Sequence, residues 1–218
     1  QPPMLEASAP VTADQKATRM KSTFAPRANP TRSENTMNEP LKPLDIPALR
    51  KSARQHMEEG AVTAGYSADR TEVIAMLNDA LATELVCVLR YRRHHFMASG
   101  IHSHATAAEF LVHSNEEQGH ADQLAERIVQ LGGEPDFSPD SLTKRSHAEY
   151  VEGATLTQMI RENLVAERIA IDSYRDMVRV LEDKDPTTSD LLRQILAVEE
   201  EHADELADLL EGMPADKD

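Results

Sequence analysis

A Glu-x-x-His-Ala-Asp motif occurs twice in the sequence, at residues 117–122 and at residues 199–204. On a helix, the Glu and the His of each motif are three residues apart and project from the same face. Such a pair can hold one metal ion between a carboxylate oxygen and an imidazole nitrogen. No other Glu-x-x-His occurs in the chain. Two copies that end in the same dipeptide indicate a metal site built from two helices.

Two further glutamates stand where core residues of a helix are expected. Glu84 and Glu167 each lie in a long stretch whose apolar residues are spaced alternately three and four apart, which is the pattern of a helix-bundle seam. Glu84 precedes Glu117 by 33 residues, and Glu167 precedes Glu199 by 32. This spacing predicts a duplicated helical hairpin in which each half supplies one Glu and one Glu-x-x-His.

These carboxylates would be costly in a bundle core. Buried carboxylates repel one another and lose hydration, which costs several kcal/mol per ion unless it is compensated. Two divalent cations would supply the compensating charge, and a carboxylate–imidazole set without thiolate suits iron or manganese. A purely structural polar layer is the alternative interpretation. The predicted ligands are Glu84, Glu117, His120, Glu167, Glu199 and His202.

Four long helices are predicted to position these ligands. They cover about 68–97, 103–132, 155–181 and 185–209. Ser67, Thr155 and Asp185 are the predicted N-caps of the first, third and fourth. Short loops make the first and second helices one antiparallel hairpin, and the third and fourth another. The linker of about 22 residues between the hairpins is long enough to cross the bundle. The seam of the first helix is predicted to end on Tyr91 and His95.

The chain is predicted to be all-α and to have three parts. Residues 1–43 contain seven prolines and no apolar periodicity, so we expect a flexible or peripherally docked arm. Residues 44–66 hold a short amphipathic helix, predicted over 45–59, and a linker. Residues 67–214 form the antiparallel four-helix bundle with its one long crossover.

Composition narrows the functional class. The formal net charge is −15, which argues against a general nucleic-acid binder and fits a protein that handles cations. Aromatic residues make up only 4% of the chain, which favours helices over a sheet. The single cysteine, Cys87, suits a reducing cytoplasm. No apolar run approaches the ~20 residues of a membrane span.

Residues 70–210 resemble the ferritin-like superfamily, and the spacing of the ligands most resembles that of the bacterioferritins. The resemblance implies that Glu117 and Glu199 bridge two iron ions. The terminal ligands that it implies are Glu84 and His120 at one iron, and Glu167 and His202 at the other.

The resemblance extends to a tyrosine seven residues after the first ligand. This is Tyr91, which the resemblance places beside the metals; a redox role and a purely structural core position are both open. The implied activity is that of a ferroxidase: two Fe(II) ions bind per subunit, O2 or H2O2 accepts electrons, and Fe(III) moves to a mineral inside a protein shell. Manganese is the alternative metal.

Two features depart from the bacterioferritin pattern. Bacterioferritins bind haem through a Met directly after the first Glu-x-x-His glutamate. Gln118 occupies that position here, so we expect no haem. The sequence continues for 16 residues beyond His202, which leaves no room for the fifth helix of 24-subunit ferritins. We therefore expect a Dps-like homo-oligomer, a 12-mer rather than a 24-mer.

Two other functions share these features. A peroxide-consuming di-metal protein resembling rubrerythrin or manganese catalase would use similar ligands, although one cysteine excludes the paired Cys-x-x-Cys motifs of a rubredoxin domain. A Dps-like shell that protects DNA is the other. Residues 1–36 carry five basic and three acidic groups, too little positive charge for strong DNA binding. His113, one turn before Glu117, is either an iron relay or a satisfied or surface histidine. Four further histidines could line a metal entry path, but the sequence favours a solvated turn for them; they are His94, His95, His102 and His104.

Overall fold

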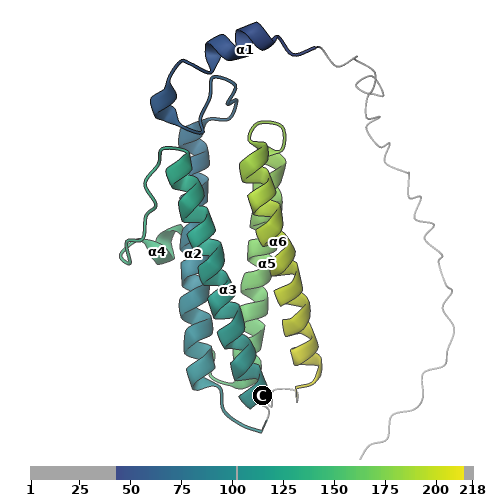
Figure 1. The fold of residues 1–218 in the computed structure, drawn as a ribbon. Helices are drawn as coiled ribbons and strands as arrows, with labels where there is room; N and C mark the ends of the chain where they lie inside the picture. The colour runs from purple at the N-terminus through teal and green to yellow at the C-terminus, as the bar shows by residue number, and fades with distance from the viewer. Residues whose placement is uncertain (1–42, 102, 214–218) are drawn as a thin grey trace, which may run out of the picture. The chain divides into compact units, whose positions relative to one another are not determined.

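The computed structural model describes residues 43–101 and 103–213, and all regular structure in these ranges is helical. The two short helices are α1 (Ile46–Ser52) and α4 (Leu142–Arg145). The bundle (Figure 1) consists of α2 (Arg70–Met97), α3 (Ser103–Gln130), α5 (Leu156–Leu181) and α6 (Pro186–Glu211). The prediction of an all-α four-helix bundle is confirmed. The arm predicted for residues 1–43 lies, up to residue 42, outside the described ranges.

Each long helix runs antiparallel to its two neighbours. α2 and α3 form one hairpin, and α5 and α6 form the other (Figure 1). At one end, the His94 ring near the end of α2 lies 3.0 Å from the carbonyl oxygen of Glu152, shortly before α5. At the other end, Arg127 of α3 pairs with Asp185 at the start of α6, at 2.9 Å. α2 therefore packs beside α5, and α3 beside α6.

The crossover between α3 and α5 runs along α2. Near the start of α2, the Asn78 side-chain oxygen accepts a hydrogen bond from the backbone N–H of Asp136 at 2.7 Å. Two-thirds of the way along, Arg90 Nη1 donates to the carbonyl oxygen of Glu149 at 3.0 Å. α4, within the crossover, also packs against α2. The crossover therefore spans the bundle, as its length predicted.

The turn that ends α3 requires two glycines. Gly132 has a φ of +78°, a left-handed conformation that residues with a side chain rarely adopt. At Gly133, a Cβ atom would lie 2.8 Å from Cγ2 of Ile74 in α2. A larger residue there would push the crossover away from α2. The pair therefore fixes both the end of α3 and the close approach of the chain to α2.

Capping side chains set where three of the long helices begin. Thr155 and Asp185 cap α5 and α6 as predicted, each accepting a hydrogen bond from the backbone N–H three residues later. The prediction of Ser67 as the first N-cap is wrong. Asp69 caps α2 instead, and the Ser67 hydroxyl donates to the carbonyl oxygen of Lys184.

The short helix before the bundle is smaller than predicted. The sequence predicts a helix over 45–59, but α1 ends at Ser52, and a separate 3-10 turn follows at Met57–Glu59. None of the α1 residues is buried, so no packing compensates for the cost of extending so short a helix. None of the described helices is long and apolar enough to cross a membrane.

The apolar core of the bundle is interrupted near its middle. One cluster of buried apolar side chains includes Leu81 and Leu124, and a second includes Cys87 and Leu206. On α2 the first cluster ends at Leu81 and the second begins at Cys87, so Glu84 lies between them. The two clusters hold the four helices together on either side of a polar layer.

Candidate metal centre

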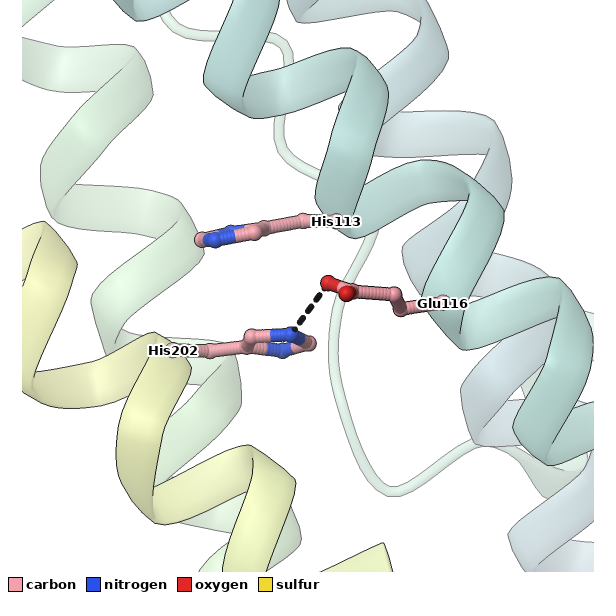
Figure 2. Close-up of side chains that lie close together, drawn as sticks. All are labelled: His113, Glu116 and His202. Carbon is pink, nitrogen blue, oxygen red and sulfur yellow. Dashed lines mark hydrogen bonds and ion pairs between the residues drawn. The ribbon is translucent and has the colours of Figure 1, made fainter.

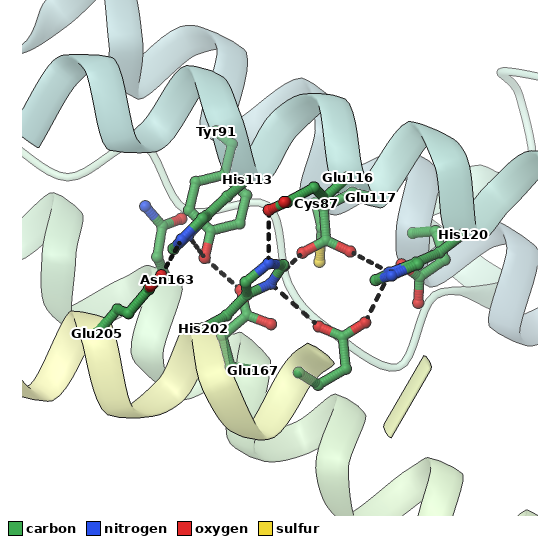
Figure 3. Close-up of polar contacts among 12 residues, drawn as sticks. Cys87, Tyr91, His113, Glu116, Glu117, His120, Asn163, Glu167, His202 and Glu205 are labelled. Atoms are coloured by element: carbon green, nitrogen blue, oxygen red, sulfur yellow. Dashed lines mark hydrogen bonds and ion pairs between the residues drawn. The ribbon is translucent and has the colours of Figure 1, made fainter. Parts of the chain in front are cut away.

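The six residues predicted as ligands lie together in this buried layer, which is called the ligand layer below. Figure 3 labels Glu117, His120, Glu167 and His202. α2 and α5 each supply one glutamate, whereas α3 and α6 each supply a glutamate and a histidine three residues later. Every glutamate is 1% exposed, and neither histidine is more than 5% exposed. The members are Glu84, Glu117, His120, Glu167, Glu199 and His202.

The ligand layer divides into two groups, in each of which four ligand atoms lie within 4.8 Å of one another. In the first group, His120 Nδ1 lies 2.9 Å from Oε1 of Glu199. Oxygens of Glu84 and Glu117 lie 3.4 Å from the same nitrogen. These four side chains come from α2, α3 and α6.

The second group uses the remaining atoms of the same two central carboxylates. His202 Nδ1 lies 3.6 Å from Oε1 of Glu117 and 3.6 Å from Oε2 of Glu199, and Glu167 completes the group. Glu117 and Glu199 therefore each direct one oxygen towards one group and the other oxygen towards the other. Carboxylates shared in this way can bridge two metal ions.

Six atoms that face into the ligand layer make no well-aligned hydrogen bond in the described part of the chain, although some lie close to an oppositely charged group, as His120 Nδ1 does to Oε1 of Glu199 at 2.9 Å. They are Oε2 of Glu84, Oε1 of Glu117, both carboxylate oxygens of Glu199, and Nδ1 of His120 and of His202. A buried polar atom without a partner costs about 1–3 kcal/mol. Because the unpartnered atoms gather in one place, the ligand layer has the chemistry of a cation site rather than of a satisfied polar network.

Burial and mutual repulsion shift the pKa values of the carboxyl groups. Burial, followed by the charges of Glu117 and Glu199, raises the pKa of Glu84 and that of Glu167 well above the usual value. Burial alone would also raise the pKa of Glu117, but contacts with the two histidines outweigh it and hold that pKa below the usual range. Glu117 is therefore ionised, whereas Glu84 and Glu167 resist ionisation.

The histidines respond to the same charges. Burial alone would lower the pKa values of His120 and His202, but the neighbouring carboxylates raise them to about 12 and about 11. Without a metal, each imidazole therefore holds a proton that partly neutralises the carboxylates. A cation that enters the ligand layer must displace these protons.

Comparisons with known proteins identify the family. Residues 74–215, more than half of the chain, match the ferritin-like domain. The chain belongs to the ferritin-like family. It is 29% identical to a bacterioferritin of Desulfovibrio desulfuricans over 141 residues, which are 64% of this chain and 75% of the relative. The resemblance inferred from the sequence is therefore confirmed.

Solved structures show the same fold as this ferritin-like chain. A dodecameric thioferritin, the bacterioferritin-related protein from Bacteroides fragilis, matches 66% of this chain and 88% of its own at 31% identity, with a TM-score of 0.64. The D. desulfuricans bacterioferritin, whose structure describes a diiron site, matches 65% and 80% at 25% identity, with a TM-score of 0.58. Dps from Thermosynechococcus elongatus matches 67% and 93% at 24% identity and a TM-score of 0.63, which shows the fold alone.

Each hairpin of the ferritin-like chain also supplies a tyrosine to the ligand layer. The Tyr91 hydroxyl donates to Oε1 of Glu167, and the Tyr174 hydroxyl donates to Oε1 of Glu84. Burial, followed by the carboxylate charges, raises the pKa of both phenols. Sequence reasoning singled out Tyr91 but missed Tyr174. The signal was present, because Tyr174 follows Glu167 by seven residues, as Tyr91 follows Glu84.

Two residues of α3 contact the His202 ring, Glu116 at its edge and His113 over its face (Figure 2). Glu116 Oε2 lies 2.9 Å from His202 Nε2. A neutral ring with its hydrogen at Nε2 would donate to Glu116 and present the Nδ1 lone pair to the ligand layer. The ring of His113 stacks on that of His202, with centroids 4.1 Å apart and an angle of 22° between the planes. Glu116 directly precedes the ligand Glu117, and the sequence favours a solvated face for it, with a role in guiding cations as the alternative.

The histidines near the turn between α2 and α3 do not join the ligand layer. The buried histidine of the α2 seam is His94 rather than the expected His95, and its ring contacts the crossover. The interpretation of His94 as part of a solvated turn is therefore wrong. α2 packs on α3, α5 and the crossover, so its buried face is wider than one seam. His102 lies outside the described residues.

Proposed function

We propose that this chain is the subunit of an iron-storing ferroxidase. Two Fe(II) ions bind as substrate, O2 or H2O2 accepts their electrons, and the ferric product accumulates as a mineral inside a homo-oligomeric shell. The observation that carries this proposal is the pair of four-ligand groups that share two carboxylates inside one buried layer.

The proposal assigns a role to each ligand. Glu117 and Glu199 bridge the two Fe(II) positions, and every unpartnered atom of the ligand layer gains a ligand role or a partner. Four carboxylates balance two divalent cations, with two neutral imidazoles completing the set. Loss of an electron raises the charge of each ion, and the clustered carboxylates stabilise that higher charge strongly in a buried site. The terminal ligands are Glu84 and His120 at one position, and Glu167 and His202 at the other.

The tyrosines orient the outer carboxylates in this proposal. The Tyr174 hydroxyl occupies Oε1 of Glu84, which leaves the unpartnered Oε2 to ligate. Tyr91 holds Oε1 of Glu167 in the equivalent way. Because each tyrosine belongs to the opposite hairpin, the two hairpins fix each other's outer ligands before a cation arrives.

The proposal includes no haem. Gln118 stands where the bacterioferritin pattern has its haem-ligating Met, and its side-chain amide donates to Oδ1 of Asp122 at 2.9 Å. An amide is a poor axial ligand for haem iron.

The proposed assembly is a shell of twelve chains in the cytoplasm. The thioferritin from B. fragilis, to which this chain is 31% identical, is dodecameric. The cytoplasm is the proposed compartment because the only cysteine, Cys87, is a buried free thiol.

Rapid-mixing kinetics test the proposed reaction. Metal-free protein is loaded anaerobically with two Fe(II) per chain and mixed with O2 or with H2O2, and Fe(III) is followed by its ultraviolet absorbance. Glu117→Ala and Glu199→Ala should each slow oxidation by more than the about 10–100-fold that a lost outer-shell contact costs. Glu126→Ala, at an exposed glutamate of α3, should oxidise Fe(II) at the wild-type rate.

The same experiment separates the competing functions. If the wild-type protein oxidised Fe(II) no faster than buffer alone, the ferroxidase proposal would be refuted. Consumption of H2O2 with Mn(II) but no accumulation of Fe(III) would instead favour a manganese-dependent peroxidase. The faster of the two oxidants identifies the electron acceptor.

A further inference from the structure

A third cluster of metal-ligating side chains lies beside the ligand layer and contains none of its members. Glu109 and His113 come from α3 and are four residues apart, and Glu205 comes from α6. One ligand atom from each lies within 4.8 Å of the others. His113 Nε2 is 2.8 Å from Oε2 of Glu205 and 3.7 Å from Oε1 of Glu109. Two helices therefore direct two oxygens towards one nitrogen.

The cluster combines a buried nitrogen with accessible oxygens. His113 is 0% exposed, whereas the side chains of Glu109 and Glu205 are 38% and 43% exposed. The buried imidazole of His113 therefore lies beneath two carboxylates that are in contact with solvent. A cation at this position would have three protein ligands and room for water in the rest of its shell. The two carboxylate charges match those of a divalent ion.

Both ring nitrogens of His113 have a polar neighbour (Figure 3). Nδ1 lies 3.3 Å from the Tyr91 hydroxyl, and Nε2 faces Oε2 of Glu205 at 2.8 Å. A divalent cation that binds Nε2 would take the place of the proton in this second contact and would gain the carboxylate oxygens of Glu205 and Glu109 as further ligands.

We propose that Glu109, His113 and Glu205 form a third divalent-cation site, separate from the two groups of the ligand layer. The His113 ring lies between this site and the layer, stacked on the His202 ring (Figure 2). A cation held there is one histidine away from the nearer group. The site requires only a divalent cation and not iron oxidation, so it stands independently of the proposed ferroxidase activity.

Metal counting by equilibrium dialysis tests the third site. Co(II) is the probe, because it occupies mixed imidazole–carboxylate sites and stays divalent in air. The variant Glu109→Gln/Glu205→Gln removes both charged ligands and keeps the shape of the side chains. The matched control Glu126→Gln/Glu211→Gln removes one exposed glutamate from each of the same two helices, so both variants lose equal charge.

The expected result is one Co(II) per chain fewer in the Glu109→Gln/Glu205→Gln variant than in the wild type, with no loss in the matched control. Equal Co(II) counts in all three proteins would overturn the third site. If the Co(II) count were equal in these three proteins but lower in a Glu117→Ala variant, the ligand layer would be supported as a metal centre and the third site would be overturned. No Co(II) in any protein would overturn both proposals.

Crystals of the Co(II)-loaded wild-type protein locate the ion directly. An anomalous difference peak among the three side chains supports the proposal. Peaks confined to the ligand layer would overturn it, whatever the dialysis count.

Discussion

At the residue scale, the ligand layer depends on two tyrosines that cross from one hairpin to the other. Tyr91 of α2 donates to Glu167 of α5, and Tyr174 of α5 donates to Glu84 of α2. Each hydroxyl takes one carboxylate oxygen and so restrains the rotamer of that glutamate. The second oxygen is then available to a cation without further reorganisation.

The substitution Tyr174→Phe should weaken cation binding. Glu84 loses the hydrogen bond that orients it, so we expect the affinity for Co(II) to fall about 10–100-fold. The free energy of unfolding of the metal-free protein should also fall by about 1–3 kcal/mol, because a buried oxygen loses its partner. Calorimetric titration measures the first effect and urea unfolding the second.

Tyr150→Phe is the matched control, because Tyr150 lies on the crossover and is 40% exposed. It removes the same hydroxyl group away from the ligand layer. A Co(II) affinity that changes equally in both variants would contradict the orienting role of Tyr174.

The protonation of the ligand layer predicts how stability depends on pH. Although burial alone would lower them, the carboxylates raise the pKa values of His120 and His202 to about 12 and about 11. Burial raises those of Glu84 and Glu167. A group with a raised pKa binds more protons in the folded state, so its contribution to stability is lost as pH rises from its unfolded pKa, about 6.5 for His, through its folded one. The metal-free protein should therefore lose stability as the pH rises from about 6.5 towards about 11.

Cation binding should show the opposite trend over the same range. It displaces protons from the imidazoles, so the apparent affinity rises with pH. A cation at ~100 times its dissociation constant adds about 2.7 kcal/mol to the free energy of unfolding. Thermal unfolding with and without Mn(II), and with Fe(II) under anaerobic conditions, should give a difference in Tm that grows with pH. A difference that is absent with both metals would refute the di-metal assignment.

At the scale of the elements, one carboxylate joins α6 to α3. Asp185 caps α6 through the backbone N–H of Thr188 at 3.0 Å, and it accepts two hydrogen bonds from Arg127 Nη2 at 2.9 and 3.1 Å. The Tyr66 hydroxyl donates to the same carboxylate at 2.9 Å. Burial, together with this bond, raises the pKa of Tyr66 to about 12. Asp185 therefore fixes the ends of two helices and the segment before α2.

Replacing Asp185 with Ala should lower the free energy of unfolding by about 3–5 kcal/mol, because Arg127 would stay buried without its ion-pair partner. Urea unfolding measures the loss. Asp190→Ala is the control on the same helix, since Asp190 forms an exposed pair with Arg193 that is worth at most about 1 kcal/mol. Similar losses of unfolding free energy in the two variants would show that the buried Arg127–Asp185 pair contributes no more to stability than an exposed pair.

Elements with local signals could be predicted from the sequence, whereas those that depend on packing could not. The capping residues Thr155 and Asp185 predict where α5 and α6 begin, and Gly132 predicts where α3 ends. α4, at Leu142–Arg145, has no such signal: it is one helical turn with one buried side chain, resting on α2. The helix predicted over 45–59 is too long for the opposite reason: none of the residues of α1 is buried among the described parts of the chain.

The candidate ligands were predictable because each interrupts an apolar seam, and burial of a carboxylate needs a physical reason. Tyr174 was within reach by comparing the two halves of the chain. Glu205 was not, because an exposed glutamate one turn from a ligand looks like any solvated residue of a helix, and the same holds for Glu109, two turns before Glu117. The i, i+4 spacing of Glu109 and His113 is visible in the sequence, but the approach of Glu205 to His113 and of Glu116 to His202 depends on how α3 and α6 are rotated against each other.

At the scale of the whole molecule, three large apolar side chains are exposed near the turn between α2 and α3. Phe96, Met97 and Ile101 are 75%, 51% and 94% exposed. Apolar side chains gathered in this way commonly mark contacts between proteins. The turn is therefore our candidate for a contact between subunits of the proposed shell.

Mass photometry of the purified chain at micromolar concentration should show one main species of about twelve chains, like the dodecameric thioferritin. Phe96→Glu/Ile101→Glu should shift this species towards smaller ones, because charge at a contact opposes its burial. Phe137→Glu, at a half-exposed position on the crossover, is the control. Monomers or dimers alone in the wild type would refute the shell.

The duplicated hairpins have equal ligands but unequal surroundings. His113 stands four residues before Glu117, whereas the counterpart four residues before Glu199 is Ile195. Two identical hairpins paired as separate chains would have to keep both halves of the centre alike. Joining them by a crossover removes that symmetry constraint, so each half can change on its own. One proposed metal position can thus acquire a stacked histidine while the other keeps a hydrocarbon neighbour. We therefore expect the two positions to differ in affinity and to fill in a preferred order.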